Sequence, residues 1–181
     1  MPMTDADALV KLTPLAPEDL DTLFQWINDP ELVAYNARFE PVSWEDHLRW
    51  YNSLSSREDL RIFAIRNRAD ARLIGTCQLR NIDLGHRTAE LVIRIGERSC
   101  WGRGLGTQAL RLLLQHAFDE LGLMRVGLFV FADNLRALRT YEKVGFVQEG
   151  RLRQAVEIGD QRKDLLVMGV LRDEFCKGEA K

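Results

Sequence analysis

The residues best suited to chemistry lie in a glycine-rich segment, Trp101-Gly102-Arg103-Gly104-Leu105-Gly106-Thr107. Three glycines at alternate positions allow backbone N–H groups to approach a ligand without interference from a Cβ atom. A long helical pattern follows at once, and the first turn of a helix carries unpaired N–H groups and a partial positive charge. Arg103 adds a cation. The segment therefore predicts a phosphate-binding loop, and a glycine turn without a ligand is the alternative.

The spacing of the glycines argues against two common phosphate-binding motifs. A Walker loop needs GxxxxGK[ST], and no lysine follows these glycines. A dinucleotide fingerprint needs GxGxxG, but Thr107 stands at the third position counted from Gly102, and Ala109 stands there counted from Gly104. Alanine is tolerated there in some sites, yet the preceding strand belongs to a meander and no acidic residue follows at the distance of a ribose partner.

The elements that must position this loop can be predicted from the hydrophobic pattern. A strand over Thr88 to Ile95 precedes it, and a helix whose apolar face runs from Leu105 to Leu121 follows it. A strand at Arg125 to Phe131 and a helix at Asn134 to Val144 come next. Further strands are predicted at 9–12, 61–65, 73–82, 146–152 and 165–171, and further helices at 17–27 and from Ser43 onward. This order predicts an α/β (α+β) fold with a mixed, mostly antiparallel sheet flanked by helices, not a doubly wound parallel sheet.

Length and composition set outer limits on the function. The 181 residues suit a single domain spanning 1–181, with 46% hydrophobic and 29% charged residues. The net charge of −2 gives no field for general nucleic-acid binding. No apolar run approaches the roughly 20 residues of a membrane helix, and no signal peptide is recognisable. Three cysteines without a CxxC and three scattered histidines predict neither a metal site nor a disulfide framework, and reduced thiols fit a cytoplasmic protein.

Two motifs together resemble the GCN5-related N-acetyltransferase (GNAT) superfamily. Gly104-Leu105-Gly106 supplies the glycines of its signature, although Trp101 stands where the signature has Gln or Arg. An aromatic residue there is common in the branch of the ribosomal-protein N-terminal acetyltransferases and the spermidine acetyltransferases. The run 134–146 is similar to the later motif, with Asn134, then Tyr141 seven residues on, then Gly145-Phe146. Segments 89–96, 19–30 and 164–175 extend the resemblance over nearly the whole chain.

The resemblance implies a sheet splayed open between its fourth and fifth strands, with acetyl-CoA as acyl-donor cosubstrate in the gap. The pantetheine arm would bond to backbone groups near Ile93 to Ile95, and the pyrophosphate would rest on the glycine loop. Asn134 would hydrogen-bond the pantetheine region, and Lys143 would either reach the nucleotide phosphate or lie on a solvated surface. The cofactor-binding residues implied in this way are Ile93, Arg94, Ile95, Trp101, Gly102, Arg103, Gly104, Leu105, Gly106, Thr107, Asn134, Ala137 and Lys143.

Transfer of an acyl group from a thioester to an amine requires a neutral amine and a protonated leaving group. Amines have pKa values near 8 to 10 and a thiol near 8.5, so a base and an acid are both useful. The resemblance implies that Tyr141 is the acid that faces the sulfur, with a role in core packing as the alternative. Glu90, which opens an apolar strand, is the candidate base. A solvated edge carboxylate, or water in place of any base, is the alternative for Glu90.

The acceptor is left open by the sequence. The resemblance implies a primary amine, on a protein N-terminus or on a small molecule such as a polyamine or amino sugar, while the net charge and the lack of a long apolar run predict no nucleic-acid or membrane partner. A polyamine site would need clustered carboxylates, for which Asp29, Glu31 and Glu40 are candidates, and Tyr35, Trp44 and Trp50 are available to line an acceptor pocket. A longer or acidic acyl group, a homodimer, and a non-catalytic CoA-binding sensor or interaction module of the same fold are alternatives.

Overall fold

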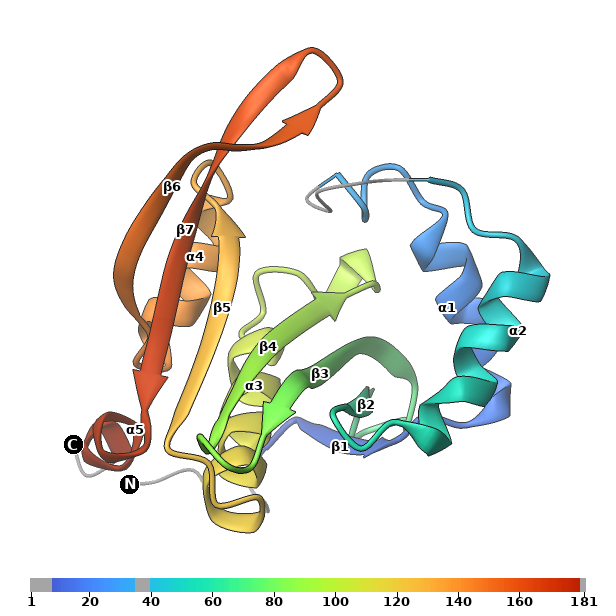
Figure 1. Ribbon diagram of the computed structural model, residues 1–181. Helices are drawn as coiled ribbons and strands as arrows, with labels where there is room; N and C mark the ends of the chain where they lie inside the picture. Colours follow the sequence, from blue (N-terminus) through green and yellow to red (C-terminus); the bar gives the residue numbers. More distant parts are fainter. Residues whose placement is uncertain (1–7, 35–39, 180–181) are drawn as a thin grey trace.

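The computed structural model describes residues 8–34 and 40–179, and its centre is one seven-stranded sheet in the order β1-β2-β3-β4-β5-β7-β6 (Figure 1). The strands are β1 Val10–Pro14, β2 Arg61–Asn67, β3 Leu73–Asp83, β4 Thr88–Ile95, β5 Arg125–Phe131, β6 Val147–Ile158 and β7 Gln161–Leu171. Strands β1 to β4 are antiparallel, and β5, β7 and β6 are antiparallel to one another. The predicted mixed sheet with an antiparallel meander is confirmed.

The two halves of the sheet meet along a short parallel contact between β4 and β5. Only Thr88, Ala89 and Glu90 of β4 pair with β5, and the last pair joins Glu90 to Gly127. Beyond that pair the two strands diverge, as Figure 1 shows. The predicted splay between the fourth and fifth strands is therefore confirmed, and it leaves one edge of each strand open from that point on.

Helices lie on both faces of the sheet and at its ends. They are α1 Leu20–Ile27, α2 Trp44–Ser53, α3 Leu105–Gln115, α4 Leu135–Lys143 and α5 Arg172–Glu179. Helix α2 begins after Ser43, whose hydroxyl accepts the backbone N–H of Asp46 at 3.1 Å, an ordinary N-cap. Helix α4 begins after Asn134 in the same way, with 3.2 Å between its Oδ1 and the N of Ala137. No helix in the described part of the chain is long and apolar enough to cross a membrane.

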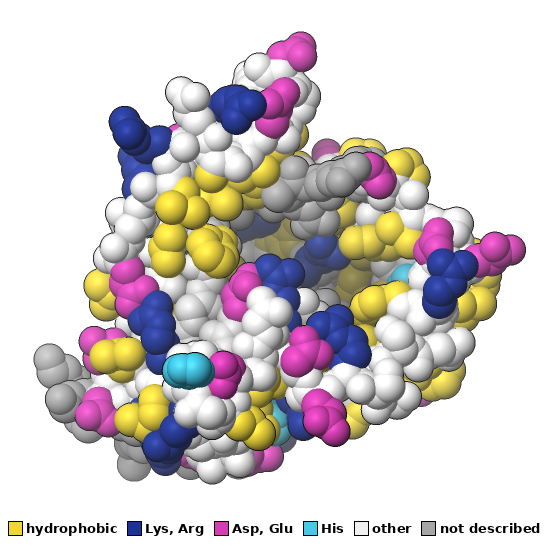
Figure 2. Space-filling model, in the orientation of Figure 1, with side chains coloured by type: hydrophobic (Ala, Val, Ile, Leu, Met, Phe, Trp, Pro, Cys, Tyr) yellow, Lys and Arg dark blue, Asp and Glu magenta, His cyan; other side chains and the backbone are white. Residues whose placement is uncertain are grey.

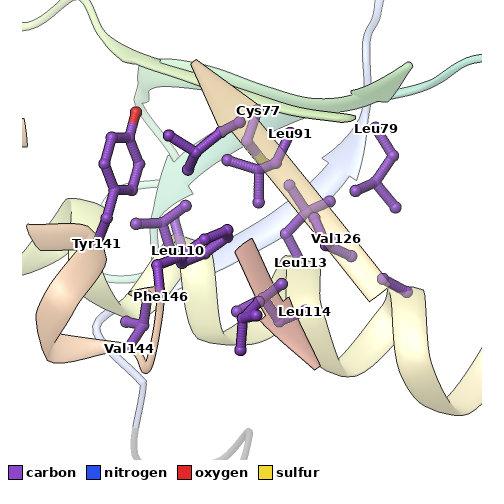
Figure 3. Close-up of a cluster of buried hydrophobic side chains, with 14 of the residues drawn as sticks. Cys77, Leu79, Leu91, Leu110, Leu113, Leu114, Val126, Tyr141, Val144 and Phe146 are labelled. Carbon is purple, nitrogen blue, oxygen red and sulfur yellow. The ribbon is translucent and has the colours of Figure 1, made fainter. Parts of the chain in front are cut away.

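The main core lies between the sheet and α3 with α4. It contains the buried side of α3 and the inward residues of β3, β4 and β5 (Figure 3). A smaller cluster on the opposite face joins Leu23 of α1 to Ala64 and Leu73. Because alternate residues of a strand face opposite sides of a sheet, Ala64 and its neighbour Ile65 belong to different clusters. Helices α1 and α2 therefore cover one face of the sheet, while α3 and α4 cover the other.

Several element boundaries differ from the sequence predictions. The first turn of α3 starts at Leu105, so the loop ends at Gly104 and not at Gly106. The helix from Leu105 continues only to Gln115 and then becomes a π-helical turn at His116–Glu120. The last two strands are much longer than predicted, because β6 and β7 continue as a hairpin that extends past the rest of the sheet in Figure 1.

Candidate active site

A groove with a volume of about 920 Å³ opens where β4 and β5 separate. Its floor and walls come from β3, β4, β5, the glycine loop, the first turn of α3, and α4. The lining residues of these parts are Gln78, Arg80, Glu90, Leu91, Val92, Ile93, Arg94, Ile95, Cys100, Trp101, Gly102, Gly104, Leu105, Gly106, Thr107, Phe129, Val130, Phe131, Asn134, Arg136, Ala137, Arg139, Thr140, Tyr141 and Lys143. In Figure 2 this region is the hollow at the centre of the face shown.

The structure brings together nearly all of the residues predicted for the site. Glu90, Tyr141 and twelve of the thirteen predicted cofactor contacts line the groove. The exception is Arg103, which is exposed and does not line it. Arg103 sits between two glycines with positive φ, at the exposed turn of the loop, and its contact with the cofactor stays a prediction.

The glycine loop has the backbone that its sequence requires. Gly102 and Gly104 have φ values of +72° and +77°, in the left-handed region that favours glycine. A Cβ atom at either position would meet no other atom within 4 Å, so the loop borders open space and not the core. Gly104 is the N-cap of α3, and the N–H groups of Leu105 and Gly106 in the first turn lack intrahelical partners. This open cradle at a helix N-terminus fits a phosphate group.

The backbone of β4 offers polar groups to the groove at alternate residues. The N–H of Gly96 donates to Ile74 on β3, so alternation turns the N–H and C=O of Ile95 and Ile93 toward the open side. One of these groups is already used, because Trp101 Nε1 donates to the carbonyl of Ile95 at 2.8 Å. Arg94 points its backbone toward β3 instead, so a backbone contact from Arg94 to the cofactor is not supported and only its side chain can reach the groove.

A stripe of cations on α4 joins the predicted Lys143 to two arginines, Arg136 and Arg139, that the sequence predictions did not name. Arg136, Arg139 and Lys143 are exposed and line the groove, at positions that share one face of the helix. The Arg136 guanidinium lies 3.9 Å from the centroid of the Trp101 ring, a cation–π contact between α4 and the glycine loop. Their spacing of three and four residues was a signal in the sequence, but without the fold nothing showed which way that face turns.

Tyr141 lies at the edge of the core with its hydroxyl in the groove. The ring packs against Phe146 at 5.7 Å between centroids, and only 8% of the residue is exposed. Figure 3 shows the hydroxyl pointing away from Val144 and Phe146. Burial raises the pKa of Tyr141 to about 12. At neutral pH the hydroxyl is therefore protonated, and it makes no hydrogen bond with any residue that the structure describes, so it is available as a donor.

Glu90 lies at the point where β4 and β5 part. Its side chain is largely buried, Arg80 donates to its Oε1, and Asn81 Nδ2 donates to its Oε2 at 3.1 Å. Arg80 stands directly opposite Glu90 in the β3–β4 register, which is why the two side chains share one face. The two donors therefore fix the position of the Glu90 carboxylate. They also occupy oxygen atoms that would otherwise accept a proton from the amine.

The residues proposed for an acceptor pocket are distributed differently from the prediction. Trp44 and Trp50 do not line the groove; they pack with Phe24 and His47 between α1 and α2. Tyr35 lies outside the described residues. Buried His47, whose Nε2 is 3.1 Å from the carbonyl of Leu20, is the centre of this aromatic cluster. This cluster was not predicted, because one histidine in an amphipathic helix has no distinctive pattern.

The carboxylates considered for a polyamine are already paired. One arginine, Arg98, places Nη2 at 2.8 Å from both oxygens of Asp29 and at 2.7 Å from Glu31. Desolvation alone would raise the pKa of Asp29, but hydrogen bonds from the backbone N–H of Leu32, from Arg98 and from the backbone N–H of Glu31 together outweigh it and hold the pKa below its usual value. The two carboxylates therefore share one arginine, and the side chain of Glu31 is 76% exposed.

Comparisons with known proteins place the groove in context. Residues 10–147 match the family described as Acetyltransferase (GNAT) domain. The spermidine N(1)-acetyltransferase of Escherichia coli K12 is 28% identical over 166 residues, 92% of this chain and 88% of its own. YdaF of Bacillus subtilis, whose name assigns it provisionally to ribosomal N-acetylation, is 32% identical over 165 residues, 91% of this chain and 86% of its own.

A solved structure resembles the whole arrangement. The crystal structure of spermidine N-acetyltransferase from Vibrio cholerae, in complex with CoA and spermine, superposes with a TM-score of 0.86 at 27% sequence identity. The match covers 93% of this chain and 98% of that chain. The fold predicted from the sequence is therefore that of a known CoA-binding enzyme structure.

Proposed function

This chain belongs to the acetyltransferase (GNAT) family, and we propose that it transfers an acetyl group from acetyl-CoA to a primary amine by direct attack of the amine on the thioester. As a member of that family it is an N-acetyltransferase. The proposed acceptor is a small-molecule amine or the α-amine of a protein N-terminus.

The observation that carries the proposal is the composition of the groove from end to end. The cradle of Gly102 and Gly104 lies in the same groove as the open edge of β4 and the hydroxyl of Tyr141. A ligand that carries phosphates, an extended amide-containing arm and a reactive sulfur would meet a matching group at each point. Acetyl-CoA has these parts, and when bound it supplies the acetyl thioester.

The cationic end of the groove supports an anionic donor. Arg136, Arg139 and Lys143 line it, and none of their side chains is paired with a carboxylate among the described residues. Asn134 is partly committed, since its Oδ1 caps α4, but its amide N–H groups remain to donate. These groups would hold the phosphates and the pantetheine arm.

Two side chains of the chain itself handle protons in the proposed reaction. The Tyr141 hydroxyl, kept protonated by burial, would donate a hydrogen bond to the departing sulfur. A thiolate, with a reference pKa of about 8.5, is a weaker base than a tyrosinate, so the proton stays on Tyr141 while the bond stabilises the leaving group, and the thiolate takes its proton from solvent. Glu90 would accept a proton from the amine, directly or through one water. The donors Arg80 and Asn81 hold the Glu90 carboxylate at the parting of the strands, where the amine would arrive.

An acetyl-transfer assay with mass detection tests the proposal. The protein would be mixed with acetyl-CoA and a panel of spermidine, simple alkylamines, amino sugars and short peptides with free N-termini. We expect release of the CoA thiol that depends on the amine, together with an amine product heavier by one acetyl group. Thiol release at the same rate with and without every amine would contradict the proposal.

A further inference from the structure

One wall of the groove is apolar and continues outward onto the leaf formed by β5, β7 and β6. Phe131 and Leu165 stand opposite each other in the β5–β7 register, as do Phe129 and Val167, so their side chains share one face. On β6, Leu152 stands opposite Leu165. We call these five residues the apolar wall.

The outer part of the apolar wall is unusually exposed for its position in a sheet. Phe129 lies in a central strand and lines the groove, yet it is 50% exposed, and Leu152 is 46% exposed. Opposite Val167, Gly150 presents no side chain that could cover it. Figure 2 shows hydrophobic side chains gathered on this leaf beside the central hollow. The apolar wall is thus continuous with the groove in which transfer is proposed.

The acidic residues near the apolar wall are all engaged. The two carboxylates that line the groove among the described residues are Glu31 and Glu90, which pair with Arg98 and Arg80. On the leaf of the apolar wall, Asp133 pairs with Lys163 and Asp164 with Arg151. Glu40 also has a partner, and the sequence of segment 35–39 contains no acidic residue.

From these two observations, and resting on the proposed function, we propose that the acceptor is a primary monoamine with an apolar substituent beside its amino group, and that Phe129 determines this specificity. The amine would enter at Glu90 while the substituent packs on the apolar wall. A polyamine brings two or three ammonium groups and would find no unpaired carboxylate among the described lining residues. Burial of an apolar chain against Phe129 and Leu165 requires no carboxylate.

A homologous series of alkylamines, from ethylamine to hexylamine, tests the proposal, with spermidine as the polycationic comparison. These alkylamines have nearly equal basicity, so they differ mainly in apolar area. For the parent enzyme we expect kcat/KM to rise by up to about fourfold for each added methylene, and to exceed that for spermidine at the longer chains.

Variants locate the effect at Phe129. Phe129→Ser should flatten the dependence of kcat/KM on chain length. Phe129→Leu should retain most of that dependence, which would show that the strand tolerates a replacement at this position. Leu171→Ser is the matched control, since Leu171 is an exposed apolar residue of β7 at the far end of the leaf, and its series should follow the parent.

The possible results separate this inference from the proposed function. If spermidine is the best substrate, or if the series is flat in the parent enzyme, the inference fails while amine acetylation stands. If no amine is acetylated although acetyl-CoA binds by calorimetry, the proposed function fails together with the inference. If Phe129→Ser lowers the mass of a dimer in sedimentation and leaves the chain-length dependence unchanged, the apolar wall is a contact between copies and the inference is wrong.

Discussion

At the scale of residues, Tyr141 and Glu90 line one groove in opposite surroundings. Tyr141 is enclosed by apolar side chains, its pKa is raised to about 12 by desolvation, and its hydroxyl has no partner among the described residues. Glu90 is held by Arg80 and Asn81. The Tyr141 hydroxyl opens onto the groove and is free to donate a hydrogen bond to a ligand there.

Replacing Tyr141 with Phe should lower turnover by roughly ten- to a thousandfold, at or below the usual range for general acid catalysis. The phenyl ring keeps the contact with Phe146, so acetyl-CoA affinity and thermal stability should change little. Single-turnover kinetics with an accepted amine would measure the chemical step. Full single-turnover activity in the variant would assign Tyr141 to packing.

The raised pKa of Tyr141 also predicts a pH dependence of stability. Below pH 10 the phenol is protonated in both the folded and the unfolded chain and contributes nothing. Above pH 10 the unfolded chain loses this proton while the folded one retains it, so stability falls as pH rises from 10 toward 12, by up to about 2.7 kcal/mol. Urea unfolding of the parent and of Tyr141→Phe at pH 9 and pH 11 would measure this, and the variant should lose less stability. Equal losses in the two proteins would show that the folded pKa is not raised.

Replacing Glu90 with Gln should lower the rate mainly at low pH, where the acceptor amine is most protonated. The amide keeps the size of the side chain and one oxygen for the donors Arg80 and Asn81, so the fold should persist. The pH profile of kcat/KM would be compared with that of the parent and of Glu157→Gln, a control at an exposed ion pair. Superimposable profiles for all three proteins would leave Glu90 with a positioning role only.

At the scale of elements, the glycine loop can be compared with a second turn whose glycine also has a positive φ. Gly104 and Gly159 both have positive φ, +77° and +58°, and a Cβ atom at either meets nothing within 4 Å. Glutamate at either position should therefore carry a similar backbone strain of about 1 kcal/mol. Only Gly104 borders the proposed phosphate site.

Gly104→Glu should reduce CoA affinity by about ten- to a hundredfold. The new carboxylate would repel the phosphates of CoA and keep them from accepting charge-assisted hydrogen bonds from the backbone N–H groups of the loop. Gly159→Glu should bind CoA as the parent does. Isothermal calorimetry on both variants, with melting temperatures to confirm folding, makes the comparison. Equal CoA affinities in the two variants would remove the loop from the site.

The elements also show what the sequence could predict. Strands β4 and β5 fall at the predicted residues, because both are apolar and bounded by turns, and the N-caps Ser43 and Asn134 mark helix starts by side-chain chemistry. The outer half of the β6–β7 hairpin was missed because it is exposed on both faces and held by ion pairs such as Arg162–Glu157. Such strands lack the alternation that identifies a half-buried strand.

The site was predictable where its chemistry is local and not where it depends on pairing between strands. The glycine loop and the run from Asn134 to Phe146 are contiguous, so their spacing was visible. Arg80 and Phe129 became part of the site only through the register of β3 with β4 and of β5 with β7. Register is a property of the folded sheet, and no pattern within one strand specifies its partner.

At the scale of the whole molecule, the groove needs its two leaves and the α1–α2 unit to keep their relative positions. Trp26 of α1 packs over Gly96 so closely that a Cβ there would lie 2.1 Å from the indole ring. Arg98, just beyond β4, binds Asp29 and Glu31 at the end of α1. These contacts connect the N-terminal helices to the end of β4, beside the groove.

An ion pair between Asp19, at the start of α1, and Arg66 of β2 also connects α1 to the sheet, and its removal should destabilise the protein. Arg66 Nη2 lies 2.9 and 2.8 Å from the two oxygens of Asp19, which also accepts the backbone N–H of Ala16. Their side chains are only 3% and 16% exposed, so Asp19→Ala would leave a buried guanidinium without its partner. That costs about 3–5 kcal/mol in comparable pairs. At roughly 2–4 °C per kcal/mol for a chain of this size, the melting temperature should fall by about 6–20 °C.

Glu157→Ala, which breaks an ion pair exposed to solvent, should change the melting temperature by less than about 4 °C. The double variant Asp19→Leu/Arg66→Met should recover much of the loss, since it leaves no buried charge. Melting curves for the parent and the three variants test this, and a loss for Asp19→Ala no greater than that for Glu157→Ala would mean that the pair does not hold α1 to the sheet.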